Sequence, residues 1–298
     1  MRLVRTIKQV RGELRAAREL GRSVEFVPTM GALHEGHLSL VRQATKKGGC
    51  VVVSIFVNPA QFGPGEDFES YPRDPDGDLA ALTGEGVDLV FAPAVAEIYP
   101  SGRIGTRIDP GAIGEVAEGL YRPGHFAGVA TVCVKLFNTV QPDRVYLGQK
   151  DAQQVAVLRQ VVADLNLPVE LVACPTVREE DGLAMSSRNR RLSPEGRRAA
   201  AVLHRALELA GELAEGGETS PEEIKAAARK VIAGQSEVGL QYLDVVDHLT
   251  FRPVDRVASG SLVILAAFVG PVRLIDNVAV GTGMRPDEAR GLNEEEQP

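Results

Sequence analysis

Two histidines one helical turn apart are the side chains of this sequence best suited to chemistry. His34 and His37 belong to residues 28–37, Pro-Thr-Met-Gly-Ala-Leu-His-Glu-Gly-His, and both imidazoles can face one ligand. Gly31 and Gly36 have no side chain, so a flat base or a phosphate can approach the backbone there. A helix that begins in this stretch would offer unpaired N–H groups and its positive dipole end to an anion. The stretch therefore predicts a nucleotide site.

Two other interpretations of this histidine pair stay open. The imidazoles could bind a metal ion, although zinc normally takes three or four protein ligands and no Cys or His cluster lies nearby. They could also satisfy hydrogen bonds inside the core. The pattern His-x-Gly-His is only moderately specific on its own.

Neutral polar residues follow the β-branched run at 50–57. Such a run is typical of a parallel strand covered on both faces, and open α/β sheets bind ligands at the carboxyl ends of their strands. Asn58 and Gln61 both donate and accept hydrogen bonds, which suits a hydroxy acid as substrate. Asn58 followed by proline is also ordinary turn chemistry, whereas a turn has no need of Gln61.

A third candidate is the turn Gly-Gln-Lys-Asp at 148–151, which follows an apolar run. Lys150 places a positive charge beside the start of the next helix, where a phosphate is favoured. Gln153 and Gln154 lie in the first turn of that helix and are expected near the same ligand.

The polar segment 179–191 is the fourth candidate. Ser186, Ser187 and the guanidinium of Arg188 can hold a polyphosphate and its developing charge. A solvated basic loop is an equally good interpretation of this segment taken alone.

The elements that position these groups alternate between strand and helix over the first ~175 residues, which predicts a Rossmann-like α/β fold with a parallel sheet and helices on both faces. The predicted strands cover 24–28, 50–57, 88–92, 144–147 and 169–174. The predicted helices cover 6–20, 38–47, 76–82, 127–140 and 152–165.

The pattern changes beyond a hinge-like Pro175-Thr176-Val177-Arg178. Helices are predicted over 194–214 and 221–233, and strands over 240–246, 261–269 and 272–275. We therefore expect a nucleotide- and substrate-binding domain over 1–176 and a smaller α+β lid domain over 177–283. The polar tail 284–298 is expected to be disordered.

Composition narrows the possible partners. The 298 residues include 33 basic and 40 acidic side chains, a net charge of −7, which disfavours nucleic acid as the main partner. No apolar run is long enough to span a bilayer, and the N-terminus lacks a secretory signal, so no membrane partner is expected. Three widely spaced cysteines in apolar runs indicate buried, reduced thiols and a cytoplasmic location. One of them could instead be a catalytic thiol.

Five motifs together resemble the pantoate–β-alanine ligase family, and the resemblance covers residues ~1–280. They are the stretch 28–37, Phe-Val-Asn-Pro-Ala-Gln-Phe-Gly at 56–63, Tyr-Arg-Pro-Gly-His-Phe at 121–126, Gly-Gln-Lys-Asp at 148–151 and Met-Ser-Ser-Arg-Asn at 185–189. The first and last also resemble the nucleotide signatures of nucleotidylyltransferases and class I tRNA synthetases.

The resemblance implies an ATP- and Mg²⁺-dependent condensation of pantoate with β-alanine through a pantoyl adenylate, in a homodimeric enzyme. It implies that His37 donates a proton and that His34, Lys150 and Arg188 complete the catalytic set. Gln61 and Gln154 are expected to orient pantoate. The expected ATP-binding residues are Met30, Gly31, Ala32, Leu33, His34, Glu35, Gly36, His37, Gly148, Gln149, Lys150, Asp151, Val177, Met185, Ser186, Ser187 and Arg188.

Two positions depart from the family pattern. Gln149 stands where an acid is common, and Gly77 stands where a carboxylate near the metal would be sought. Asp76 or Asp78 could replace that carboxylate, but ATP oxygens and water can also coordinate the ion. No protein ligand to Mg²⁺ is therefore predicted.

Two other functions would use the same motifs differently. A nucleotidylyltransferase that moves AMP onto a phosphate predicts a basic pocket in place of Gln61 and Gln154. A non-catalytic nucleotide-binding regulator would not need both histidines together with Lys150 and Arg188.

Overall fold

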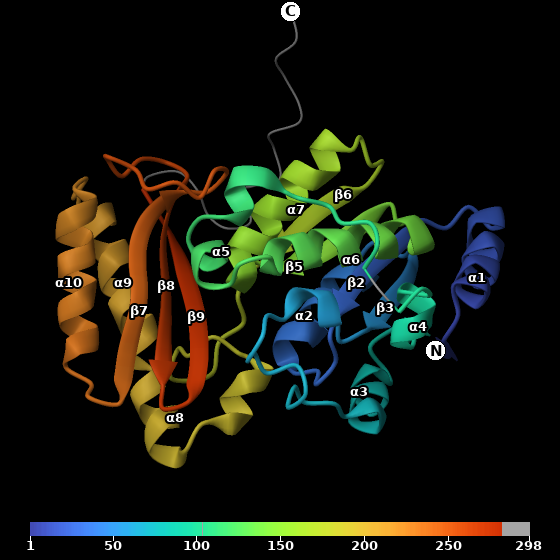
Figure 1. Cartoon of the computed structure of the whole chain (residues 1–298), viewed down its shortest axis with the longest axis horizontal. Helices are drawn as coiled ribbons and strands as arrows, with labels where there is room; N and C mark the ends of the chain where they lie inside the picture. The colour runs from blue at the N-terminus through green and yellow to red at the C-terminus, as the bar shows by residue number, and fades with distance from the viewer. Residues whose placement is uncertain (103, 282–298) are drawn as a thin grey trace, which may run out of the picture. The chain divides into compact units, whose positions relative to one another are not determined.

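The computed structural model describes residues 1–102 and 104–281, which form two compact units (Figure 1). The first unit contains Met1–Gly148 and Gln154–Val172, and the second contains Gln149–Gln153 and the chain from Ala173 onward. The predicted tail 284–298 lies outside the described residues. The binding and lid functions expected of the two domains stay predictions.

The first unit is built on a six-stranded parallel sheet, which confirms the predicted α/β fold. In spatial order its strands are β1 (Arg2–Val4), β4 (Leu89–Phe91), β3 (Cys50–Ile55), β2 (Val24–Thr29), β5 (Arg144–Gly148) and β6 (Glu170–Cys174). The chain runs from β2 outward to β3 and β4 and then returns to β5 on the other side of β2. This reversal makes the carboxyl ends of β2 and β5 the expected ligand-binding edge of the sheet.

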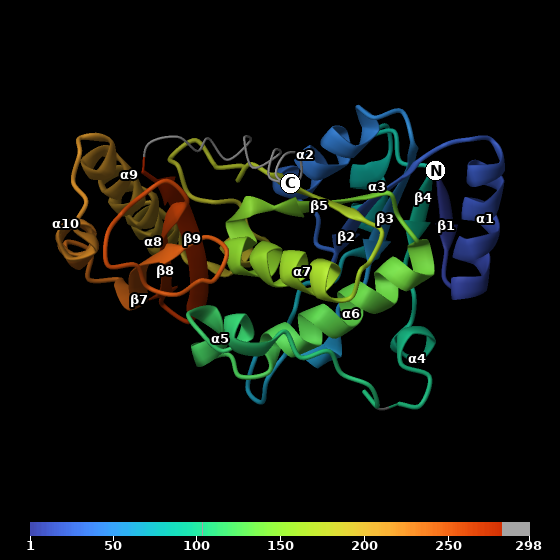
Figure 2. The same cartoon turned by 90° about the horizontal axis from the view of Figure 1, so that it is seen from above.

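Helices cover both faces of this sheet, as predicted. Right-handed crossovers place successive helices on one face while the chain moves one way and on the other face when it returns. One face carries α2 (Glu35–Thr45) and α3 (Pro75–Leu82). The other carries α1 (Ile7–Glu19), α6 (His125–Val140) and α7 (Ala152–Asp164), and Figure 2 shows α6 and α7 opposite α2 and α3.

Short helical segments lie in the connections of the first unit. They are η1 (Pro59–Gln61), α4 (Val95–Ile98), η2 (Gly111–Gly114) and α5 (Glu118–Tyr121).

Glu25 interrupts the apolar run of β2, and its carboxylate is completely buried. It accepts hydrogen bonds from Arg144 (2.8 Å) and Tyr146 (2.8 Å) of the neighbouring strand β5 and from Ser23 (2.7 Å). A buried charge is tolerated only when it is paired and hydrogen-bonded. These contacts fasten β2 to β5 at the start of the two strands that carry the candidate site.

The second unit is α+β, also as predicted. Its antiparallel sheet consists of β7 (Val238–Asp247), β8 (Ser261–Val269) and β9 (Val272–Val280) in that order. Apolar side chains of α9 (Val202–Glu215) and α10 (Pro221–Ala233), such as Leu207 and Ile224, form one core with this sheet. The unit also contains η3 (Gln149–Asp151), η4 (Ser187–Arg191) and α8 (Pro194–Ala200).

Three details differ from the sequence prediction. The strand β1 was not predicted, because three residues are too few to show a period. The helix predicted over 194–214 is divided at Ala201 into α8 and α9. The strand β9 continues to Val280, five residues beyond its predicted end, because the polar pair Asp276 and Asn277 is buried inside it. No helix among the described residues is long and apolar enough to cross a membrane.

Candidate active site

The two histidines form a reciprocal cap at the start of α2. The Nδ1 atom of His34 accepts a hydrogen bond from the backbone N–H of Gly36 (3.2 Å), and Nδ1 of His37 accepts from the N–H of His34 (3.4 Å). This is the capping-box arrangement with imidazoles in place of the usual oxygens. Because both Nδ1 atoms act as acceptors, each neutral ring carries its proton on Nε2. The ring centroids lie 4.1 Å apart, so the structure brings the pair together as predicted.

A buried carboxylate fixes the turn before this helix. Asp78 of α3 accepts hydrogen bonds from the backbone N–H groups of Ala32 (3.0 Å) and Leu33 (2.7 Å). Gly31 has a φ of 81°, and a Cβ there would lie 2.8 Å from Asp78 Oδ2, so the position requires glycine. Ala32 also has a positive φ of 50°, a conformation that costs free energy for a residue with a Cβ.

One prediction about the turn is a helix start whose N–H groups attract an anion. The N–H group of Gly36, in the first turn of α2, donates to His34 Nδ1, and those of Ala32, Leu33 and His34, before the helix, donate to Asp78 and to His37 Nδ1. The anion site stays a prediction, and the Nε2–H groups of the imidazoles are further donors suited to an anion. Glu35, the first residue of α2, forms an ion pair with Arg42.

Gln61 is a buried amide directly beside this turn. Its Nε2 donates to the sulfur of Met30 (3.1 Å), and its Oε1 accepts from Nδ2 of Asn58 (3.1 Å). Only 8% of the Gln61 surface is exposed. Met30 follows β2 and Gln61 follows β3, so the expected hydroxy-acid residue and the histidine turn lie together at one edge of the sheet.

The amide of Asn58 is completely used by protein atoms. Nδ2 donates to Gln61 Oε1 and to the carbonyl of Gly128 (3.1 Å), and Oδ1 accepts from the N–H of Ala60 (3.2 Å) and the hydroxyl of Tyr99 (2.8 Å). Burial raises the pKa of Tyr99 to about 12, so the hydroxyl stays a donor. Four hydrogen bonds exhaust the capacity of one side-chain amide for its two protons and two lone pairs. Gln154, the other expected amide, is half-buried in the first turn of α7, just after β5.

The second unit contains the candidate phosphate-binding residues. Asn277 of β9 donates two hydrogen bonds from its amide to the carbonyls of Gln149 (3.0 Å) and Lys150 (2.9 Å). The backbone of η3 is therefore anchored to a strand 127 residues away in sequence. Lys150 is half-buried, and its neighbours in the sequence are Gln149 and Asp151.

The 185–188 loop is held by the same strand and by its own hydrogen bonds. Asp276, next to Asn277, accepts two hydrogen bonds from the guanidinium of Arg178 (2.6 and 3.1 Å). Met185 donates its N–H to the carbonyl of Val177 (3.0 Å), and the Ser186 hydroxyl accepts from the N–H of Arg188 (3.3 Å). Ser187 is buried. Neighbouring residues of β9 thus support both candidate loops of this unit.

No metal site is apparent in the part of the chain that the structure describes. Within it, no three His, Cys, Asp or Glu side chains are close enough together to hold an ion. Asp78 is engaged with backbone N–H groups, and a Cβ on Gly77 would clash with the carboxylate of Asp74 at 2.2 Å. Asp78, one of the two carboxylates considered for Mg²⁺, is thus used to hold the backbone of the turn before α2. All three cysteines are buried, and none of them forms a disulfide.

Several supporting residues escaped the sequence analysis. Asp78 was considered only as a metal ligand, and Asp276 and Asn277 were overlooked, although two polar residues inside an apolar strand pattern are a usable signal. Arg122 and His125 of the 121–126 motif contact the Gln61 backbone, as described below.

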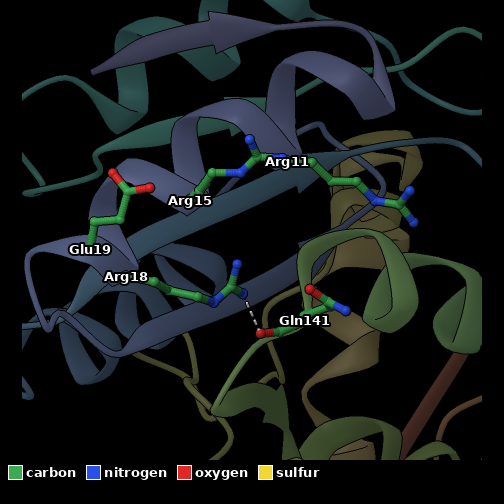
Figure 3. Close-up of a pocket in the computed structure, with 5 residues that line it drawn as sticks. All are labelled: Arg11, Arg15, Arg18, Glu19 and Gln141. Atoms are coloured by element: carbon green, nitrogen blue, oxygen red, sulfur yellow. Dashed lines mark hydrogen bonds between the residues drawn. The ribbon is translucent and has the colours of Figure 1, made fainter.

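A surface pocket lies elsewhere in the first unit (Figure 3). It has a volume of about 440 Å³ and is lined by residues of α1 and by Gln141, which follows α6. Arg18 donates to the carbonyls of Val140 (2.8 Å) and Gln141 (2.6 Å), where a cation stabilises the end of a helix. None of the candidate site residues lines this pocket.

Comparisons with known proteins identify the family of this chain. The family model described as pantoate-beta-alanine ligase matches residues 2–279. The chain is 51% identical to the pantothenate synthetase of Moorella thermoacetica over 280 residues, 94% of this chain and 99% of that protein. It is 55% identical to that of Chloroflexus aurantiacus over 266 residues, 89% of this chain and 94% of that protein.

Solved structures give the same result. The pantothenate synthetase of Thermus thermophilus has a TM-score of 0.89 and 48% identity, covering 94% of this chain and all of that one. The pantoate-beta-alanine ligase of Francisella tularensis, complexed with beta-gamma ATP and beta-alanine, has a TM-score of 0.77 and 35% identity, covering 94% of this chain and 97% of that one. This chain therefore belongs to the pantoate-beta-alanine ligase family.

Proposed function

We propose that this protein condenses pantoate with β-alanine to form pantothenate and uses ATP to activate the acid. The observation that carries the proposal is the contact between Gln61 and Met30. It supports the proposal because the amide that we expect to bind the acid then lies close to the turn that carries the paired histidines. Membership of the family supports the same reaction.

The reaction is proposed to proceed in two steps. A carboxylate oxygen of pantoate attacks the α-phosphorus of ATP, the bond from that phosphorus to the α,β-bridging oxygen breaks, and pyrophosphate leaves. The amine of β-alanine then attacks the acyl carbon of pantoyl adenylate, loses a proton and expels AMP. Both steps depend mainly on positioning and on neutralising negative charge.

His34 and His37 are proposed to donate hydrogen bonds from Nε2 to the phosphates, with His37 as the proton donor. The reciprocal cap supports this role, because it fixes each ring with Nε2 as the protonated atom. Lys150, Ser186, Ser187 and Arg188 are proposed to hold the polyphosphate as it separates. The positive charges of Lys150 and Arg188 would stabilise the leaving pyrophosphate, and the serine hydroxyls would donate hydrogen bonds to it.

The nucleoside is proposed to contact Met30, Gly31, Gly148, Asp151 and Val177. Gln61 and Gln154 would orient pantoate through their amides. We assign Asn58 to the positioning of Gln61 and no longer to direct contact with the acid, since all four of its hydrogen bonds are made within the protein.

Magnesium is proposed to enter with ATP. The ion would be coordinated by phosphate oxygens and water, as Mg²⁺ usually is when it accompanies a nucleotide. We also propose a homodimer in a reducing, cytoplasmic compartment, in keeping with three buried cysteines that form no disulfide. Light scattering of the purified protein would test the dimer.

Exchange of labelled pyrophosphate into ATP tests the proposed chemistry. We expect exchange that requires pantoate and does not require β-alanine, because only the first step is reversed. Exchange that proceeds without any acid, or with a phosphate acceptor in place of pantoate, would indicate a nucleotidylyltransferase. No exchange together with no pantothenate formation would reject the proposed function.

A further inference from the structure

The motif Tyr-Arg-Pro-Gly-His-Phe at 121–126 contains charged and titratable groups that the proposed mechanism leaves without a role. His125 Nδ1 lies 2.8 Å from the backbone carbonyl oxygen of Gln61, and Arg122 Nη2 lies 3.3 Å from the same oxygen. Because a carbonyl only accepts, Nδ1 of His125 must carry the ring proton. Two side chains therefore donate to the main chain of one substrate-binding candidate.

Further contacts fix both donors. Nε2 of His125 accepts from Arg122 Nη1 (3.1 Å), so the arginine selects the ring tautomer that donates to Gln61. The guanidinium also forms a bidentate pair with Glu66 (2.9 and 2.6 Å) and lies 3.5 Å from Glu118. Burial alone would raise the pKa of Glu66, but the hydrogen bonds and charge of Arg122 outweigh it, and the pKa is lowered.

The histidine remains neutral at ordinary pH. Burial, together with the charge of Arg122, lowers the pKa of His125 to about 4, against the opposing effects of the Gln61 carbonyl and of the carboxylates Glu118 and Glu66. A neutral ring can donate to Gln61 and accept from Arg122 at the same time. A protonated ring would carry a proton on Nε2 and lose the second contact.

The backbones at this place are in close contact. A Cβ on Gly128 would lie 2.1 Å from the carbonyl oxygen of Ala60 and 2.7 Å from Cα of Gln61, so α6 tolerates only glycine there. The Gly128 carbonyl also accepts from Asn58. The three-residue η1 cannot define its own position, and α6 together with the 121–126 motif defines it instead.

We propose that Arg122 and His125 are positioning residues for pantoate. They hold the main chain of Gln61 so that its side-chain amide can form a hydrogen bond with the acid. This inference rests on the proposed function, in particular on the assignment of Gln61 to pantoate. Misplacing a binding group by about 1 Å can cost about 10²-fold in rate. The motif thereby acts on the substrate through a residue about sixty positions earlier in the chain.

Substitution of His125 by a shape-matched apolar residue tests the proposal. We expect His125→Leu to raise the KM for pantoate about tenfold, the effect of losing one buried hydrogen bond. The KM for ATP and for β-alanine should change less than twofold. His125→Asn should restore most of the pantoate KM, because the asparagine amide can donate from nearly the position of Nδ1. Arg122→Lys should give an intermediate value, since an ammonium cannot make the bidentate pair.

His248→Leu is the matched control. His248 Nδ1 makes a similar contact with a backbone carbonyl, that of Gly260 (2.9 Å), in the second unit. We expect this variant to lose stability while leaving the pantoate KM unchanged. If His125→Leu fails to fold, the milder His125→Asn and Arg122→Lys variants carry the comparison.

The outcomes separate the inference from the proposed function. An unchanged pantoate KM in His125→Leu, or an equal rise in the KM for ATP, would overturn the positioning role. If His125→Leu and His248→Leu changed the pantoate KM equally, the His125 contact would contribute only to the stability of the protein. Absence of pantoate-dependent activity in the unmodified enzyme would instead reject the proposed function itself.

Discussion

The carboxylate of Asp78 accepts a hydrogen bond from the backbone N–H of Leu33 at 2.7 Å, and a second one from Ala32. Asp78 lies on α3 and Leu33 in the turn that leads into α2, so one side chain fixes the backbone from which the two histidines project. The turn contains an alanine with positive φ, and such a conformation persists only where neighbouring contacts hold it.

Replacing Asp78 by asparagine tests this support. We expect Asp78→Asn to lower the free energy of unfolding by about 1–3 kcal/mol, because one of its two charged acceptor contacts is lost. The KM for ATP should also rise. Denaturant titration and initial rates measure both quantities. Asp76→Asn removes the same charge from an exposed neighbouring position and should change neither.

His37 is expected to act in catalysis. We expect His37→Ala to lower kcat by ~10²-fold or more, the usual contribution of a positioned proton donor. The unfolding free energy should fall by only about 1 kcal/mol, the cost of a lost cap. Gln43→Ala on the same helix is the control. Near-normal turnover of the His37 variant would leave the histidine with a structural role only.

Gln61 should affect one substrate selectively. We expect Gln61→Ala to raise the KM for pantoate by about tenfold or more. The KM for ATP should rise much less, because the amide reaches the expected nucleoside contacts only through the sulfur of Met30. Steady-state kinetics at saturating ATP gives the first value. Lost ATP saturation with an unchanged pantoate KM would reverse the assignment.

Asn277 should affect the other substrate. Its amide supports the carbonyls of Gln149 and Lys150, so Asn277→Ala is expected to raise the KM for ATP several-fold and to leave the pantoate KM unchanged. Gln241→Ala removes an amide from β7 of the same sheet and should have little effect on either value. A uniform loss of activity in both variants would contradict the specific role of Asn277.

His125 should make stability depend on pH in a defined window. The pKa of His125 is about 4 in the folded protein, below the value of about 6.5 for a free histidine. Between these values the unfolded chain binds a proton that the folded chain does not, so stability falls as pH falls. The shift predicts a loss of about 2 kcal/mol between pH 7 and pH 5.

Denaturant titration of the unmodified protein and of His125→Gln measures this loss. The variant should show a shallower fall over the same range. Carboxylates titrate mainly below pH 5, so they contribute little within this window. Parallel curves for the two proteins would contradict the assignment.

The sequence was sufficient for features encoded locally. The alternation of strand and helix predicted the parallel sheet, and spacing alone brought His34 and His37 to one turn. Partnerships between distant residues were not visible in this way. Asp78 accepts from a backbone N–H 45 residues earlier in the chain, and Asn277 donates to a carbonyl 127 residues earlier. Neither hydrophobic periodicity nor turn-forming residues predict such long-range pairs.

The expected anion site at the start of α2 shows a related difficulty. Helix-capping rules predicted open N–H groups because neither histidine was considered as a cap. His34 and His37 serve both as caps of α2 and as the proposed contacts to phosphate. A histidine at these positions is therefore compatible with a structural role and with a binding role. Only coordinates could show which ring nitrogen faces the backbone.

The five residues Gln149–Gln153 belong to the second unit, although the chain on both sides of them belongs to the first. The polypeptide therefore passes from one unit to the other three times, and no single cut separates them. A fragment that stops at the apparent hinge near residue 176 would keep the lysine turn but discard the asparagine that anchors it. Such a fragment should retain the histidine pair in its native setting and leave Lys150 on an untethered loop.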